Sequence, residues 1–268
     1  MYVGAALAVD LFARLSPAAV AVLRLVGAAV VLIAWRRPGR DAWQGRRLAR
    51  AAAFGLATAC MNIAFYEAIA QLPLGTAVAI EFCGPVAVAA VASRRPRDIA
   101  AVVMAAVGVL LIADVRWSGS PSGVLWALAA ASLWAAYIVL GKRVASAGNG
   151  LDDMAVGFGI AAVVLSPLML LNGWPGVVAL ADLRVLIIGA GVGVLSSVVP
   201  YVLDQIVLRR VGQARFAVLL ALLPATATIV GFVWLYQLPG LLEALGIAAV
   251  VAAVALRSKD GDTAEPVG

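Results

Sequence analysis

Three ionisable residues, Arg24, Glu81 and Asp204, lie inside long apolar runs or near their ends. A charge inside a membrane is costly, and such residues tend to mark solute or proton pathways. Glu81 therefore favours a site that carries a proton or binds an amine, although pairing with a neighbouring helix would also explain it. Arg24 could reach the membrane surface, pair with Glu81 or hold a substrate carboxylate. For Asp204, a surface ion pair with Arg209 is a strong alternative.

Three hydrogen-bonding residues and four helix-breaking residues accompany these charges. The first set could bind a solute or only join helices, and comprises Asn62, Tyr66 and Tyr201. The second set comprises Gly84, Pro85, Pro200 and Pro224. A proline inside a helix leaves a backbone carbonyl without its donor, and such a carbonyl can serve as a ligand. We therefore expect kinks that line a cavity, with Glu81 one turn before the first of them.

The composition indicates that lipid is the solvent of these runs. Of the 268 residues, 64% are hydrophobic and 13% are charged, and the mean hydropathy is +1.04. Soluble domains are about 45–50% apolar and about 25% charged. The net charge of +6 is spread between apolar runs and forms no basic face, so nucleic acid is not an expected partner. The chain has no histidine, which excludes His-ligated metals and Ser-His-Asp catalysis, and no cofactor is expected.

Nine apolar runs are long enough, or nearly so, to cross a bilayer as helices, and a shorter run at 3–15 precedes them. The nine runs are 17–35, 50–71, 74–92, 98–113, 121–141, 154–172, 184–207, 214–238 and 240–256. The short first run predicts either an initiation site further upstream or a truncated member of its family. The polar tail at 257–268 is predicted to be disordered.

The distribution of Lys and Arg predicts the orientation in the membrane. Sixteen of the twenty fall in alternate connections or in the tail, three fall in the other connections, and Arg24 lies within a span. Cytoplasmic loops carry the excess of positive charge. Both termini are therefore predicted in the cytoplasm, which requires an even number of helices in a multi-pass protein of the inner membrane.

The two halves of the chain, 1–115 and 120–256, resemble each other at an offset of about 139 residues, which places Pro85 over Pro224. Each half holds five spans, an odd number, so the second half must enter the membrane from the opposite face. The predicted fold is an all-α membrane protein of about ten transmembrane helices in two inverted five-helix repeats, with a shortened first helix.

Several stretches resemble the EamA-type carriers of the drug/metabolite transporter superfamily, and in particular their threonine/homoserine exporter branch. The most specific part runs from Pro73 to Asp98 and includes Pro73-Leu74-Gly75-Thr76-Ala77-Val78-Ala79-Ile80-Glu81-Phe82-Cys83-Gly84-Pro85 and Ser93-Arg94-Arg95-Pro96-Arg97-Asp98. Three further stretches add to the match: Ala21-Val22-Leu23-Arg24-Leu25, Met61-Asn62-Ile63-Ala64-Phe65-Tyr66 and Val199-Pro200-Tyr201-Val202-Leu203-Asp204. The second half departs from the family pattern, because Leu223 stands where Glu usually precedes the proline. The resemblance implies a carrier of small metabolites.

The sequence thus predicts a secondary transporter, not an enzyme, that exports amino acids such as threonine or homoserine. The chain contains no phosphate-binding loop of the Gly-x-x-x-x-Gly-Lys type, so a proton gradient is the expected energy source, with Glu81 as the carrier. Glu81 and Arg24 could meet the ammonium and the carboxylate of a zwitterion. The expected partners are the lipid bilayer and a small-molecule substrate, and a homo-oligomer is left open. The alternatives are a membrane subunit without flux of its own and an intramembrane enzyme.

Overall fold

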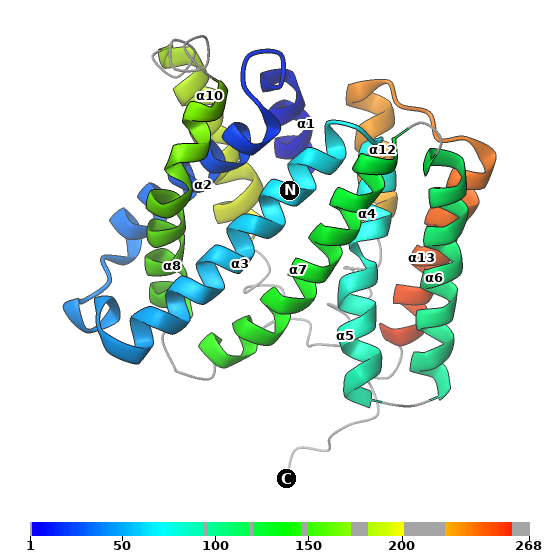
Figure 1. The fold of residues 1–268 in the computed structure, drawn as a ribbon, viewed down its shortest axis with the longest axis horizontal. Coiled ribbons are helices and arrows are strands. Elements are labelled where there is room, and N and C mark those ends of the chain that lie inside the picture. Colours follow the sequence, from blue (N-terminus) through cyan, green and yellow to red (C-terminus); the bar gives the residue numbers. More distant parts are fainter. Residues whose placement is uncertain are drawn as a thin grey trace.

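The computed structural model describes residues 2–93, 96–117, 120–145, 150–172, 182–200 and 223–258. Every regular element in these ranges is helical (Figure 1). In chain order they are α1 (Tyr2–Leu11), α2 (Pro17–Arg36), η1 (Arg40–Trp43), α3 (Gly45–Ile69), α4 (Leu74–Glu81), α5 (Cys83–Ser93), α6 (Pro96–Trp117), α7 (Pro121–Ala145), α8 (Gly150–Leu165), η2 (Ser166–Asn172), α10 (Leu183–Gly193), the π-helical turn η3 (Val194–Val198), α12 (Leu223–Leu235) and α13 (Leu241–Ser258).

Four of the described helices are long and apolar enough to cross a membrane, and they cover Pro17–Arg36, Gly45–Ile69, Pro121–Gly141 and Gly150–Leu170. Shorter apolar helices cover Leu74–Val88, Ile99–Leu111, Leu183–Val198, Thr226–Leu235 and Leu241–Ala253. The helical interpretation of these apolar runs is therefore confirmed. The count of ten spans stays a prediction, because two of the predicted runs, 184–207 and 214–238, lie partly outside the described residues.

Local sequence signals explain where α2 begins and ends. The Ser16 side chain accepts a hydrogen bond of 3.2 Å from the backbone N–H of Ala19, and Pro17 occupies the first helical position, where its missing N–H costs nothing. Glu67 of α3 adds a second acceptor at this end, because its carboxylate receives the N–H of Ala18 at 3.2 Å. At the other end Arg37 adopts a left-handed conformation with φ of 47° and closes the helix.

The helices pack in pairs that join residues far apart in the sequence (Figure 1). Contacts link α2 to α8, α4 to α12 and α6 to α13, and further contacts link α3 to both α7 and α8 and α10 to both α1 and α2. The largest buried apolar cluster is drawn mainly from α1, α2, α3 and α4, with residues of α7, α10, α12 and α13. The candidate site residues of α2 and α4 are therefore held inside the bundle.

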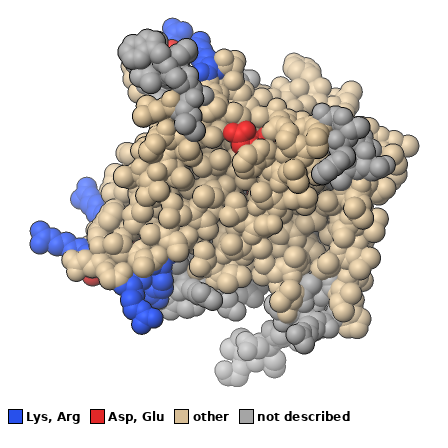
Figure 2. Space-filling view, viewed as in Figure 1, with Lys and Arg blue, Asp and Glu red and all other residues tan. Residues whose placement is uncertain are grey.

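The face of the molecule seen in Figure 2 is largely uncharged where it is described. Large apolar side chains point outward along the helices, among them Val91, Leu110 and Val163. Lys and Arg gather toward the ends of the bundle, most clearly around the turn formed by 36–50 (Figure 2). Such a surface would be unfavourable in water and suits a lipid environment.

Close backbone contact between α3 and α8 depends on glycine. A Cβ atom added to Gly55 would lie 2.1 Å from the carbonyl oxygen of Gly157. We expect Gly55→Ala to lower the thermal midpoint of the purified protein, because overpacking of this kind costs about 1–3 kcal/mol. Gly191→Ala is the matched control, since a Cβ there meets no atom within 4 Å. Equal midpoints for the two variants, measured by size-exclusion thermostability in detergent, would contradict the expectation.

Candidate functional site

The predicted kink before Pro85 is present as a break between two helices. Helix α4 ends at Glu81, Phe82 forms a turn, and α5 begins at Cys83. Proline at 85 cannot donate to the carbonyl of residue 81, which weakens the helix at this point. Gly84 serves helix packing, because a Cβ there would lie 2.0 Å from the carbonyl oxygen of Ala131 in α7.

Glu81 is buried, with 3% of its surface exposed. The four ion pairs among the described residues do not involve it. Arg24 is near enough to act on its carboxylate electrostatically. A carboxylate in this position is costly to keep charged, and protonation or a bound cation would relieve that cost.

Arg24 is also buried, with 5% of its surface exposed, and it is held by the second half of the chain. Its Nε donates to Ser197 Oγ at 3.0 Å, and its Nη2 donates to the backbone carbonyl of Ser196 at 2.8 Å. The guanidinium is thus fixed through one edge by η3. A guanidinium has five donors in a planar fork, so further donors stay available for a carboxylate.

The π-helical turn η3 and the proline that follows it explain why the Ser196 backbone carbonyl can accept a hydrogen bond from Arg24. In this π-helical turn the N–H of Val199 donates to the carbonyl of Val194, and Pro200, four residues after Ser196, has no N–H to offer the Ser196 carbonyl. The Ser196 hydroxyl itself turns back to the carbonyl of Val192, one helical turn earlier. Gly193 lets the start of η3 lie close to the backbone of α2, because a Cβ there would lie 2.5 Å from the carbonyl oxygen of Arg24.

Tyr66 lies next to Arg24. The Arg24 guanidinium carbon is 5.6 Å from the centre of the Tyr66 ring, within the range of a cation–π contact. The Tyr66 side chain is fully buried at 0% exposure, and its hydroxyl has no hydrogen-bond partner among the described residues. The structure therefore brings Arg24, Glu81 and Tyr66 into one polar region inside the bundle.

The other predicted site residues have varied positions. The Asn62 amide donates to the carbonyl of Thr58 in its own helix at 2.7 Å, which favours a structural role. Pro200 follows η3 and is partly buried, and Pro224 lies in the first turn of α12 and is buried. Tyr201 and Asp204 lie outside the described residues, so their predicted roles are not tested.

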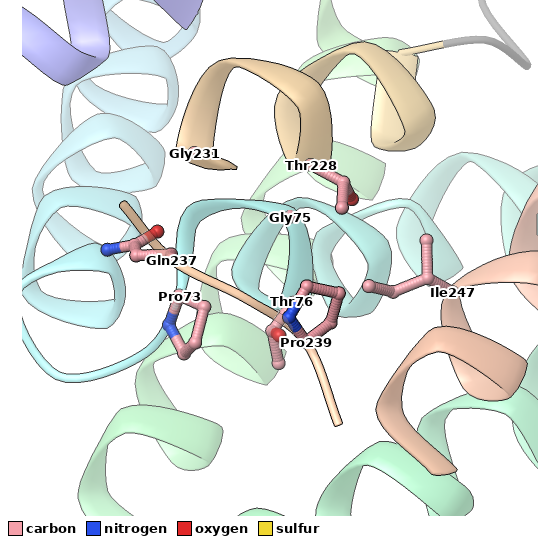
Figure 3. Close-up of a pocket in the computed structure, with 8 residues that line it drawn as sticks. All are labelled: Pro73, Gly75, Thr76, Thr228, Gly231, Gln237, Pro239 and Ile247. Carbon is pink, nitrogen blue, oxygen red and sulfur yellow. The ribbon is translucent and has the colours of Figure 1, made fainter. Parts of the chain in front are cut away.

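A second polar cluster lies at the start of α4 and joins it to the connection between α12 and α13 (Figure 3). The Thr76 hydroxyl donates to the buried Glu243 carboxylate, and the backbone N–H of Leu74 donates to Gln237 Oε1 at 2.9 Å. These residues adjoin a small pocket lined by Pro73, Gly75, Thr76, Thr228, Gly231, Gln237, Pro239 and Ile247. The cluster ties the N-terminus of α4 to the second half of the chain.

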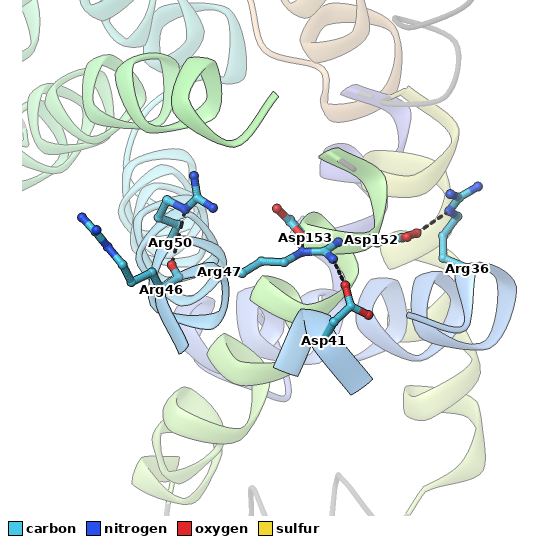
Figure 4. Close-up of polar contacts among 7 residues, drawn as sticks. All are labelled: Arg36, Asp41, Arg46, Arg47, Arg50, Asp152 and Asp153. Atoms are coloured by element: carbon cyan, nitrogen blue, oxygen red, sulfur yellow. Dashed lines mark hydrogen bonds and ion pairs between the residues drawn. The ribbon is translucent and has the colours of Figure 1, made fainter. Parts of the chain in front are cut away.

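A third cluster joins the two halves at the end of the bundle near residues 36–50 (Figure 4). Arg47 pairs with Asp41 and, at 2.6 Å, with the buried carboxylate of Asp153, while Arg36 pairs with Asp152 at 2.9 Å. These ion pairs fasten α2 and α3 to the first turn of α8. Arg36 and Arg47 therefore have a structural role in this segment.

The sequence interpretation missed Ser196, Ser197, Thr76 and Glu243. Two adjacent serines inside the apolar run 184–207 were a visible signal. Their meaning depended on Arg24, which is more than 170 residues away along the chain.

Comparison with known proteins decides the family. The model of the EamA-like transporter family matches residues 121–258. The chain is also 36% identical over 253 residues to the "Threonine/homoserine exporter RhtA" of Salmonella typhimurium strain LT2, covering 93% of this chain and 84% of that protein. This chain belongs to the EamA-like transporter family. The predicted resemblance is thereby confirmed, and the EamA-like chain is a multi-pass membrane protein of transporter type.

A second sequence relative and a solved structure also match the EamA-like chain. The "Threonine/homoserine exporter RhtA" of Escherichia coli K12 is 35% identical over the same length and coverage. A solved crystal structure of a protein matches with a TM-score of 0.55 and 19% identity, covering 97% of this chain and 94% of that one. At that identity the likeness concerns the fold alone, and it extends over nearly the whole chain.

Proposed function

We propose that this EamA-like protein is a proton-coupled exporter of small amino acids, of which threonine and homoserine are the best candidates. The observation that carries the proposal is the buried pair of opposite charges, Glu81 and Arg24, which no ion pair joins to each other among the described residues. A zwitterionic amino acid needs an anion for its ammonium and a donor fork for its carboxylate. The relatives named as threonine/homoserine exporters support this substrate class.

The proposed architecture is a pair of inverted repeats, 1–115 and 120–256, followed by a cytoplasmic tail at 257–268. Suppose that α1, α2, α3, α4–α5 and α6 correspond to α7, α8, α10, α12 and α13. Exchanging the halves then turns the contact of α3 with α7 into that of α10 with α1, and the contact of α3 with α8 into that of α10 with α2. The pairs α2–α8, α4–α12 and α6–α13 map onto themselves. This exchange pattern supports a two-fold relation between the halves.

The proposed site lies at the interface between the repeats, where secondary transporters of this architecture bind their substrates. Arg24, Glu81 and Tyr66 belong to the first repeat, and η3, which holds the Arg24 guanidinium, belongs to the second. Movement of the repeats against each other would therefore act on the Arg24 guanidinium through its hydrogen bonds to Ser196 and Ser197. In this mechanism, protonation of Glu81 weakens its hold on the ammonium group and couples release of the amino acid to proton movement.

A direct test uses sealed vesicles that contain only the purified protein. Vesicles loaded with radiolabelled threonine or homoserine should lose label faster than protein-free vesicles when a pH gradient is imposed. A panel of other amino acids defines the substrate range. Absence of flux for every amino acid would overturn the proposal and favour a membrane subunit without transport of its own.

The proposed orientation places both termini and residues 36–50 in the cytoplasm. We expect a cysteine at Gly240 to react with an impermeant maleimide from outside intact cells, and a cysteine at Gly39 to react only after permeabilisation. Gly39 and Gly240 are both exposed, so each variant controls for the other. The experiment starts from a protein in which Cys60 and Cys83 are replaced. The reverse labelling pattern would overturn the orientation.

A further inference from the structure

The Tyr66 hydroxyl is a polar atom that the protein buries without satisfying. The side chain is 0% exposed, and the hydroxyl is the buried side-chain polar atom left without a partner among the described residues. Buried tyrosine hydroxyls normally find a hydrogen-bond partner, because an unmade bond inside a protein is costly. An orphaned hydroxyl of this kind calls for a partner supplied from elsewhere.

The ring of Tyr66 is held in place on several sides, so the hydroxyl oxygen cannot easily move toward another partner. The Arg24 guanidinium lies over the ring at 5.6 Å, and the rings of Phe12 and Phe65 meet it edge to face at 5.9 Å and 6.1 Å between centres. Asn62, one turn earlier on the same helix, donates its amide hydrogen to the backbone of Thr58 instead. The Tyr66 ring is therefore fixed beside Arg24, and its hydroxyl is a donor and acceptor without a partner among the described residues.

We propose that the Tyr66 hydroxyl is the specificity-determining contact that recognises the side-chain hydroxyl of the transported amino acid. The inference rests on the proposed function, because Arg24 beside it is the group that binds the carboxylate. Threonine and homoserine share two features, an α-amino acid head and a hydroxyl on a short side chain. With the head at Arg24 and Glu81, a hydroxyl one or two carbons further along the side chain would reach the neighbouring Tyr66.

This recognition works by penalising the wrong solute. A hydroxyl group of the solute can donate to or accept from Tyr66, whereas a methyl group leaves the tyrosine oxygen buried and unpaired. Sites built to hydrogen-bond a substrate hydroxyl reject analogues that lack it more strongly than apolar pockets reject a change of one methyl group. The solute that fits is therefore a short hydroxyamino acid, and its apolar isostere is excluded.

The test compares isosteric pairs in sealed vesicles, namely threonine with valine and homoserine with norvaline. Wild-type protein should favour the hydroxylated member of each pair by at least about 10-fold in flux at low concentration. Tyr66→Phe should reduce the preference to within about 3-fold by lowering flux of the hydroxylated member. Tyr236→Phe is the matched control, because its side chain is exposed at the surface, and its preference should stay at the wild-type value.

A second measurement does not depend on flux. Threonine should raise the thermal midpoint of the detergent-purified wild-type protein more than valine does, and Tyr66→Phe should respond equally to both. Equal fluxes of the two isosteres in wild type, or an equal fall for both in Tyr66→Phe, would overturn this inference and leave the proposed exporter intact. No flux of any amino acid in wild type would overturn both.

Discussion

Glu81→Gln is expected to abolish export driven by a pH gradient, while a weaker exchange of substrate across the membrane remains because the neutral side chain holds the ammonium group less tightly. Glutamine has nearly the shape of the protonated carboxyl group and keeps its hydrogen-bonding capacity, but it cannot release a proton. The buried position of Glu81 inside the bundle, directly before the break at Phe82, motivates the expectation. Gradient-driven efflux of threonine should fall at least about 10-fold, toward the rate without a gradient.

Glu67→Gln is the matched control for this variant. The Glu67 carboxylate is only partly buried and accepts a hydrogen bond from the N–H of Ala18, a role that a glutamine oxygen can keep. Gradient-driven efflux in this control should stay near the wild-type value. Unchanged gradient-driven efflux in Glu81→Gln would assign Glu81 a structural role. Complete loss of both efflux and exchange would mean that Glu81 is required for substrate binding, and it would leave the proposed proton coupling without support.

The sequence was sufficient for the parts of the molecule that stand out chemically. Charged residues are rare inside apolar runs, so Arg24 and Glu81 could be found by inspection, and the structure buries both. The apolar runs themselves were long enough to predict helices, and the break in the first half follows from a proline at a mid-helix position. Each of these signals is local, which is why a single sequence contains it.

Contacts between distant segments could not be predicted in this way. The partners of Arg24 are a hydroxyl and a carbonyl more than 170 residues away, and hydroxyl groups are too common in apolar helices to mark a site. Glu243 lies in the first turn of α13, a position where a carboxylate is usually exposed at the surface. In the structure it is fully buried and accepts a hydrogen bond from Thr76. The Asn62 amide donates to the carbonyl of Thr58 in its own helix, and its predicted role in solute binding stays a prediction.

Substitution of Arg24 by lysine is expected to weaken substrate binding strongly. Lysine carries one compact ammonium group on a flexible stem, so it cannot serve Ser197, Ser196 and a substrate carboxylate in one fixed geometry. A hydrogen bond to a charged group contributes about 1.5–3 kcal/mol. Since about 1.4 kcal/mol corresponds to tenfold, the half-saturation concentration for threonine should rise about 10- to 100-fold.

The role of the carboxylate can be isolated by a substrate analogue. Threoninamide keeps the ammonium and the hydroxyl of threonine but lacks the charged carboxylate, so it should compete poorly for the wild-type protein. In Arg24→Lys the difference between threonine and threoninamide should shrink, because the guanidinium that distinguishes them is gone. A variant that keeps the wild-type half-saturation concentration, or the full difference between the two compounds, would remove Arg24 from the site.

Ser197→Ala separates positioning from direct contact. This variant removes the acceptor of Arg24 Nε but leaves the guanidinium and the Ser196 carbonyl in place. We expect a smaller loss of affinity for threonine than in Arg24→Lys, since one of the two anchoring bonds remains. The double variant should be no worse than Arg24→Lys alone, because Ser197 acts only through the arginine. Additive losses in the double variant would instead mean that Ser197 contacts the substrate itself and that η3 does more than hold Arg24.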